Sequence, residues 1–179
     1  MSGTLAATVV ESVRIKREFF ERNREAISAQ AVLLAATLNR GGKLITFGNG
    51  GSAADAQRAA ACLIRRGMRA VALPTMYTPD GPSFASLYQA LRSTGDCALA
   101  ISTSGNSENI LKTVEMAQQN GDTVIAFSGN SGGRLRGLVP NALLVGDHDT
   151  RYPTARIQEV HLMLVHELCA VATPLVNHA

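Results

Sequence analysis

The feature that most constrains the fold of this chain is a series of five short apolar runs between residues 41 and 179, separated by segments of helical character. Each run is continuously apolar rather than alternating, which is typical of strands covered on both faces. We therefore predict a doubly wound α/β fold, a five-stranded parallel sheet flanked by helices. The predicted strands are 44–47 (LITF), 70–74 (AVALP), 97–102 (CALAIS), 123–128 (TVIAFS) and 142–146 (ALLVG).

The first forty residues show no strand pattern and predict an N-terminal pair of helices. Their apolar face must be buried, and other predicted helices already flank the sheet. The pair therefore packs either within the subunit or between subunits. We favour pairing between subunits. The whole chain, 1–179, is then one domain, with oligomerisation helices over 1–40 and the α/β core over 41–179. The two apolar series are Leu5, Val9, Val13, Phe20 and Ile27, Leu33, Leu34, Leu38.

Composition argues against several classes of protein. The apolar stretches are far shorter than a bilayer span and the N-terminus is mixed in charge, so we expect no signal peptide, no membrane helix and a cytoplasmic location. Cys62, Cys97 and Cys169 are spaced too irregularly for a disulfide framework or a zinc knuckle. The 17 Lys and Arg residues are scattered and aromatic residues make up only 4%. Nucleic-acid binding is therefore not expected.

The loop after the first predicted strand is rich in glycine and leads directly into a helix. Its residues Asn49, Gly50, Gly51 and Ser52 allow close approach of a ligand to the backbone, and the free N–H groups of the helix start favour an anion. The alternative is a tight strand-to-helix turn with Ser52 as a cap. The segment is neither a dinucleotide-binding fingerprint nor a P-loop, so both interpretations stay open.

The loop after the third predicted strand gathers four hydroxyls and one amide at the start of a helix. These residues are Ser102, Thr103, Ser104, Asn106 and Ser107. A helix cap explains one hydroxyl and leaves the other three without a structural role. Together with the unpaired N–H groups of the first helical turn, they predict a phosphate-binding loop that uses no lysine.

Three ordered motifs, in segments 47–56, 95–137 and 155–169, carry a resemblance that covers nearly the whole chain. The chain resembles the sugar isomerase (SIS) domain family, and within it the phosphoheptose isomerases and a non-enzymatic relative that binds the bacterial replication initiator. The resemblance implies a flavodoxin-like fold and a homotetramer with its sites at subunit interfaces. It also implies a sugar phosphate as ligand, with the phosphate on the serine and threonine residues of 102–107 and the sugar on Asn49–Ser52.

An aldose–ketose isomerase needs an acid and a base tuned toward neutral pH. Gln158 and His166 share one face of the last predicted helix. The resemblance implies that His166 is the catalytic histidine and that Gln158 contacts the substrate. It also implies that these two residues match two of the four metal ligands of zinc-containing members. Taken alone, a histidine on an apolar helix face is more often a structural residue.

The chain departs from the isomerases on the helix after the glycine-rich loop. There the isomerases carry a histidine and, one turn later, the glutamate that acts as base or metal ligand, whereas this chain has Arg58 and Cys62. Arginine cannot accept a proton, and a thiol in an apolar helix is expected to stay protonated. A zinc site ordinarily has at least three protein ligands. We therefore predict no metal cofactor, with zinc on Gln158 and His166, and Cys62 as a third donor, as the alternative.

Two further segments differ from the isomerases. Segment 74–96 is shorter and lacks their acidic and amide contacts to the sugar, and Ala155 replaces the aspartate that precedes their RIQE stretch, as in the initiator-binding relative. Asp147, His148 and Asp149 are interpreted as a solvated loop rather than a ligand cluster.

The prediction from all these features is a phosphosugar-binding protein with little or no turnover. The alternatives are an active sedoheptulose 7-phosphate isomerase and an adaptor for a protein partner such as the replication initiator.

Overall fold

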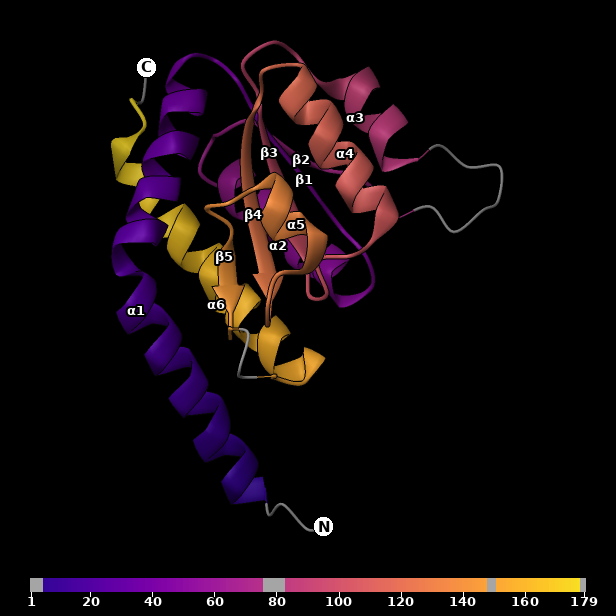
Figure 1. Cartoon of the computed structure of the whole chain (residues 1–179). Coiled ribbons are helices and arrows are strands. Elements are labelled where there is room, and N and C mark those ends of the chain that lie inside the picture. Colours follow the sequence, from indigo (N-terminus) through magenta and orange to yellow (C-terminus); the bar gives the residue numbers. More distant parts are fainter. Residues whose placement is uncertain (1–4, 76–82, 148–150, 178–179) are drawn as a thin grey trace.

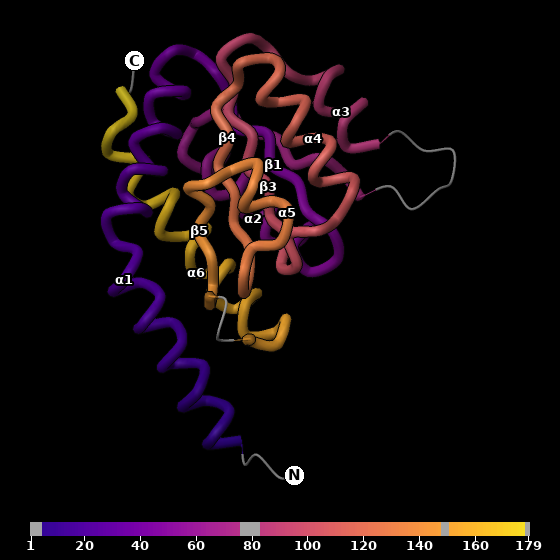
Figure 2. Tube along the Cα trace, in the orientation of Figure 1, coloured from indigo at the N-terminus to yellow at the C-terminus, as the bar shows by residue number. Residues whose placement is uncertain are grey.

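The computed structural model describes residues 5–75, 83–147 and 151–177 and contains a five-stranded parallel sheet between two layers of helices (Figures 1 and 2). The strands lie in the order β2-β1-β3-β4-β5. This confirms the predicted sheet, and the order is that of flavodoxin-like folds. The strands are β1 (Leu44–Gly48), β2 (Ala70–Ala72), β3 (Cys97–Ser102), β4 (Thr123–Gly129) and β5 (Leu143–Val145).

Six α-helices and one 3-10 turn make up the rest of the regular structure in the described residues. They are α1 (Leu5–Asn39), α2 (Gly51–Ile64), α3 (Phe84–Leu91), α4 (Glu108–Gln119), α5 (Gly133–Leu138), α6 (Thr154–Ala172) and the 3-10 turn η1 (Thr173–Leu175). None of these helices is long and apolar enough to span a bilayer.

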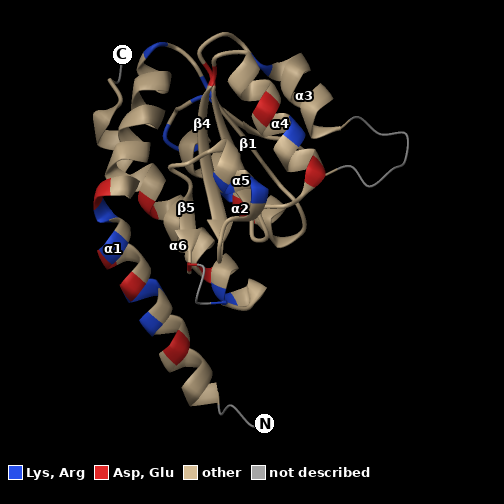
Figure 3. Ribbon diagram, viewed as in Figure 1, with Lys and Arg blue, Asp and Glu red and all other residues tan. Residues whose placement is uncertain are grey.

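Alternate residues of the strands pack into two separate apolar cores, one on each face of the sheet. In β3, Leu99 and Ile101 pack on the side of α1, α2 and α6, whereas Ala98 and Ala100 pack on the side of α3, α4 and α5. The strands have no charged residue, and in Figure 3 the Lys, Arg, Asp and Glu residues lie on helices and loops. Burial of both faces explains why the strand pattern was continuously apolar.

The N-terminal region is one continuous helix of 35 residues, not the pair of helices that the sequence predicted. The segment between the two apolar series contains no proline or glycine, so nothing interrupts the helical hydrogen bonds. The C-terminal half of α1 packs on α6 and the sheet, while its first turns extend beyond the body of the molecule (Figure 1). Leu5 and Val10 are 81% and 68% exposed there.

Buried ion pairs lie near the amino ends of the strands. Lys43 Nζ lies 2.5 Å from a carboxylate oxygen of Asp96, which is 1% exposed. Asp122 accepts hydrogen bonds from Arg92 Nε at 2.7 Å and from the Tyr88 hydroxyl at 2.9 Å. Burial alone would raise the pKa of Asp96, but the hydrogen bonds from Lys43 and Ser93 outweigh it and lower that pKa. These contacts fix the end of the sheet that lies away from the glycine-rich and hydroxyl-rich loops.

Candidate functional site

The two loops singled out in the sequence meet where the strand order reverses, between β1 and β3. Their helices, α2 and α4, leave the sheet on opposite faces, which opens the crevice in which ligands of such sheets bind. The side chains of Asn49 and Asn109 join the loops by two reciprocal amide hydrogen bonds of 3.0 Å. The structure thus brings together two segments that are about fifty residues apart in the sequence.

Two of the hydroxyls in the β3–α4 loop shape the loop itself. Ser102 is 5% exposed, and its Oγ accepts a hydrogen bond of 3.2 Å from the Gly105 N–H. Ser104 Oγ accepts one of the same length from the Asn106 N–H. The Asn106 side chain in turn accepts a hydrogen bond from the Arg134 N–H at the start of α5.

The other two hydroxyls, those of Thr103 and Ser107, have no hydrogen-bond partner within the described part of the chain. Ser107 occupies the N-cap position of α4, but its side chain does not cap the helix. The Ile110 N–H donates to Asn109 Oδ1 at 3.0 Å, whereas the N–H groups of Glu108 and Asn109 have no partner in the described part of the chain. Free hydroxyls beside a helix start are suited to an anionic oxygen. The loop therefore divides into two hydroxyls that hold its shape and two that are available to a ligand.

Beside this loop lies a cavity of about 330 Å³, which we term the loop cavity. Three of the predicted residues line it, together with residues of the β4–α5 loop and of the segment before α6. The lining residues are Thr103, Ser104, Asn106, Gly129, Asn130, Ser131, Asp147 and Arg151. The last five were not predicted as site residues. Residues 129–131 lie at the carboxyl end of β4, at the same edge of the sheet, and that position was the available signal.

The glycine-rich loop is packed against the start of α6. A Cβ at Gly51 would collide with Gln158 Nε2, so a larger residue there would make the Gln158 amide turn away from this loop. Ser52 is buried, and its N–H donates to Asn49 O at 3.0 Å, while Gly50 has a φ of 52° and is exposed. Gln158 therefore lies next to the predicted sugar-binding loop.

His166 lies two turns further along α6, roughly 12 Å from Gln158 along the helix axis. Its side chain is exposed, and Nδ1 lies 3.8 Å from Cys62 Sγ on α2. Cys62 is 1% exposed, and the Arg65 guanidinium lies 3.7 Å from its sulfur. The predicted catalytic histidine therefore contacts a thiol where the isomerases that the sequence resembles have a carboxylate.

A buried carboxyl group that the sequence analysis did not single out lies on the same helix. Asp55 is 7% exposed, and its Oδ2 has no hydrogen-bond partner in the described structure. Burial raises the pKa of Asp55 to about 6, and the nearby Arg58 only partly opposes this. Gly51 and Cys62 both contact α6, and Asp55 shares their face of α2.

The described side chains at this site do not form a set of zinc ligands. No group of three His, Cys, Asp or Glu side chains is placed to hold a metal within residues 5–75, 83–147 and 151–177. Arg58 carries no lone pair for a metal, and Gln158 and His166 are neutral donors. These residues do not fit a zinc ion of the kind that the resemblance implied.

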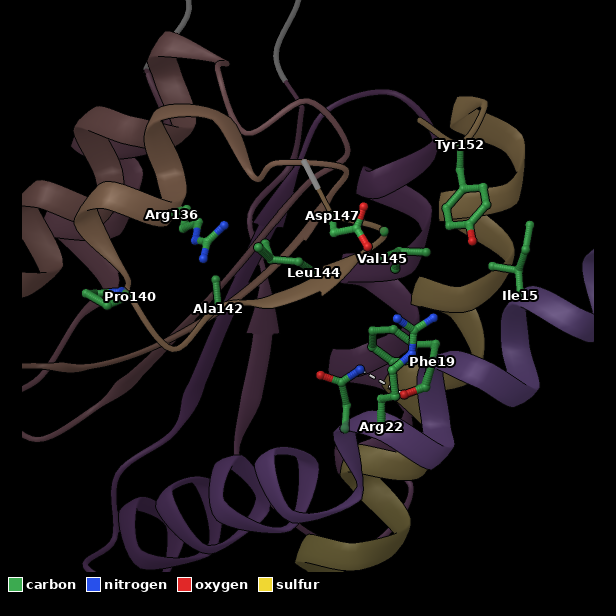
Figure 4. Close-up of a pocket in the computed structure, with 12 residues that line it drawn as sticks. Ile15, Phe19, Arg22, Arg136, Pro140, Ala142, Leu144, Val145, Asp147 and Tyr152 are labelled. Carbon is green, nitrogen blue, oxygen red and sulfur yellow. Dashed lines mark hydrogen bonds between the residues drawn. The ribbon is translucent and has the colours of Figure 1, made fainter. Parts of the chain in front are cut away.

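A second cavity, of about 310 Å³, lies between α1 and the β5 region (Figure 4). Ile15 and Phe19 of α1 line it together with Leu144 and Val145, and Arg22 and Arg136 add charge at its edges. It contains none of the predicted site residues. We assign no ligand to it, because one wall is formed by α1, the helix for which we predicted subunit contacts.

Comparison with known proteins gives a consistent result. A family model described as the SIS domain matches residues 9–129. The phosphoheptose isomerase of Thermodesulfovibrio yellowstonii is 40% identical over 174 residues, covering 89% of this chain and 85% of that protein. The phosphoheptose isomerase of Aquifex aeolicus is 38% identical over 181 residues, covering 93% of each. The solved structure of a phosphoheptose isomerase from Francisella tularensis has a TM-score of 0.83 at 32% identity, with 96% of this chain and 98% of that chain covered.

Proposed function

Since the chain belongs to the SIS domain family and is of its phosphoheptose isomerase type, we propose that it binds a sugar phosphate and turns it over slowly or not at all. The observation that carries the binding half of this proposal is the pair of unpartnered hydroxyls, Thr103 and Ser107, at the start of α4. They lie in the loop that borders the loop cavity, at the edge of the sheet where ligands of this fold bind. The relatives named above carry the name of an enzyme that acts on a heptose phosphate.

The catalytic half rests on Arg58 and Cys62. An arginine stays protonated at ordinary pH and cannot serve as a base. Cys62 is almost fully buried, and no carboxylate stands at its position to take a proton from the sugar. One general acid or base contributes roughly 10² to 10⁴ in rate, so the loss of one should slow isomerisation by about that factor. We propose no metal in the site, because the donor set does not fit one.

The test combines a binding and a turnover measurement on the full-length protein. Sedoheptulose 7-phosphate should raise the melting temperature and give a saturable calorimetric titration, and conversion to a heptose phosphate should be absent or slow. Thr103→Ala and Ser107→Ala should each weaken binding, whereas Thr94→Ala should not. Thr94 is an exposed threonine at the opposite end of β3 and is the matched control. Unchanged affinity in both loop variants would remove the binding assignment.

A second candidate, an active isomerase, is favoured by one observation, the 3.8 Å contact between Cys62 Sγ and His166 Nδ1. A thiol and an imidazole at this distance can share a proton, and such a pair can act as acid and base. Turnover that is abolished by His166→Ala and by Cys62→Ala, with sugar phosphate binding retained, would establish this candidate and overturn the proposed loss of catalysis. Turnover that is equal in wild type and His166→Ala would exclude it.

A further inference from the structure

The loop cavity contains two charged side chains, and only one of them is a cation. Its other lining residues are the uncharged Thr103, Ser104, Asn106, Gly129, Asn130 and Ser131. The charged pair consists of Asp147 and Arg151. Arg151 is exposed, and no ion pair or hydrogen bond occupies its guanidinium within the described part of the chain. A guanidinium beside three residues of a predicted phosphate loop is placed to meet an anion.

The backbone next to Arg151 is fixed by an unusual residue. Asn130 has a φ of 52°, and it is the only described residue other than glycine with a positive φ. Its side-chain oxygen accepts a hydrogen bond of 2.7 Å from the Tyr152 N–H, and its side-chain nitrogen donates to Tyr152 O at 3.5 Å. Its own N–H donates to Val145 O at 2.8 Å. Strained backbone of this kind persists where surrounding contacts hold it, and here it ties the segment containing Arg151 to the β4–α5 loop.

The two charges also indicate what kind of ligand the cavity suits. Arg151 favours a phosphate oxygen, with which a guanidinium forms two parallel hydrogen bonds. The carboxylate of Asp147 disfavours a bare anion but accepts hydrogen bonds from hydroxyl groups. A phosphate ester of a polyhydroxy compound offers an anionic oxygen to Arg151 and hydroxyl groups to the other polar residues of the cavity, whereas inorganic phosphate offers only the anion.

We propose that Arg151 binds the phosphate of the ligand and makes the site selective for phosphorylated over unphosphorylated sugars. This inference rests on the proposed function, since it concerns the same ligand. It adds a charged contact to a loop whose other phosphate contacts are neutral. Segment 151–155 (RYPTA) carries no motif that indicates this role, because only the fold brings it to the β3–α4 loop.

The experiment is a calorimetric titration of the full-length protein with sedoheptulose 7-phosphate, sedoheptulose and inorganic phosphate, at low and high salt. Replacing Arg151 by Gln should weaken binding of the sugar phosphate about tenfold, as expected for the loss of a hydrogen-bonded charge. The variant should also reduce the salt dependence of binding. Arg151→Lys keeps the charge but not the paired hydrogen bonds, so its affinity for the sugar phosphate should lie between those of wild type and Arg151→Gln. Arg40→Gln, which removes an exposed arginine before β1, is the matched control and should bind like wild type.

The two proposals fail in different ways. If wild type binds no sugar phosphate, both the proposed function and the proposed role of Arg151 are wrong. If wild type binds and Arg151→Gln binds equally well at both salt concentrations, only the role of Arg151 is overturned. Thermal melting of each variant without ligand shows whether it is folded, and Arg151→Lys supplies the comparison if Arg151→Gln is unstable.

Discussion

At the scale of single residues, the β3–α4 loop carries two hydroxyls without a partner in the described structure, and α2 carries Arg58 and Cys62 where the isomerases that the sequence resembles have a histidine and a glutamate. The hydroxyls of the β3–α4 loop were predicted as site residues because an excess of serine and threonine at a helix start can be recognised in the sequence without knowledge of the fold. Which hydroxyls are free was not visible, because Ser102 and Ser104 are engaged through local backbone geometry. Asp55 was missed because its chemistry arises from burial rather than from a motif.

Asp55 leads to a prediction about stability. Its pKa is raised from 3.8 to about 6 in the folded protein, so between these values the folded state binds more protons than the unfolded state. The free energy of unfolding should therefore fall as the pH rises through this window, with the full penalty above pH 6. Replacing Asp55 by Asn removes the titration. The stability of Asp55→Asn relative to wild type should increase between pH 4 and pH 7.5 by up to about 3 kcal/mol.

Urea denaturation of both proteins at several pH values measures this difference. Burial also lowers the pKa of His161 to about 4, which acts in the opposite direction over the same range. Both proteins contain His161, so its contribution cancels when the two are compared. A stability difference that is constant with pH would mean that the Asp55 carboxyl does not titrate in this way.

At the scale of elements, the β3–α4 loop depends on the close approach of two backbone segments. Gly105 has a φ of 66°, and a Cβ there would collide with the carbonyl oxygen of Gly132 in the β4–α5 loop. The Leu135 N–H donates to Gly105 O at 2.9 Å, so the two loops are also joined by a hydrogen bond. The β3–α4 loop and the far wall of the loop cavity therefore form one unit.

Gly105→Ala should destabilise the protein and weaken sugar phosphate binding at the same time. Gly121→Ala is the matched control, since Gly121 also has a positive φ, 72°, but nothing lies within 4 Å of the position its Cβ would take. The free energy of unfolding should fall by about 1 kcal/mol in the control, from backbone strain alone, and by at least about 2 kcal/mol in Gly105→Ala. Denaturation midpoints and calorimetric titrations measure both effects. Equal losses in the two variants would show that the loops are not tightly packed.

The strands were predictable element by element, whereas the helices were predictable only in part. Runs such as CALAIS are apolar on both sides and bounded by turn residues, so their ends in the structure agree with the sequence to within two residues. The N-terminal helix was divided in two because its apolar series shifts phase, and a phase shift does not break a helix without proline or glycine. The contact between α2 and α6 that joins Cys62 to His166 is tertiary, and only a resemblance could suggest it.

At the scale of the whole molecule, α1 offers an apolar surface that the rest of the chain does not cover. Six of the eleven exposed large apolar side chains in the described residues lie on this helix. They are Leu5, Val9, Val10, Val13, Val32 and Leu33. An apolar patch of this kind on a protruding helix favours association, in line with the homotetramer that the sequence analysis predicted.

The wild-type protein is accordingly expected to elute as a tetramer in size-exclusion chromatography with light scattering. Val9→Glu combined with Val13→Glu places two charges on this surface and should yield smaller species. Glu11→Gln changes an exposed residue between them without adding charge to the apolar face, and should leave the assembly intact. If the double variant still forms tetramers, the subunit contact lies elsewhere. A monomeric wild type would contradict the prediction.

The ion pairs beneath the amino ends of the strands have a consequence for how such a protein diverges. Lys43 with Asp96, and Arg92 with Asp122, hold the amino ends of the strands, while the loop cavity lies at their carboxyl ends. Exchanges in the loops at the carboxyl ends can therefore accumulate without disturbing these ion pairs. A lineage can change the chemistry of one edge of the sheet while the architecture beneath it is kept.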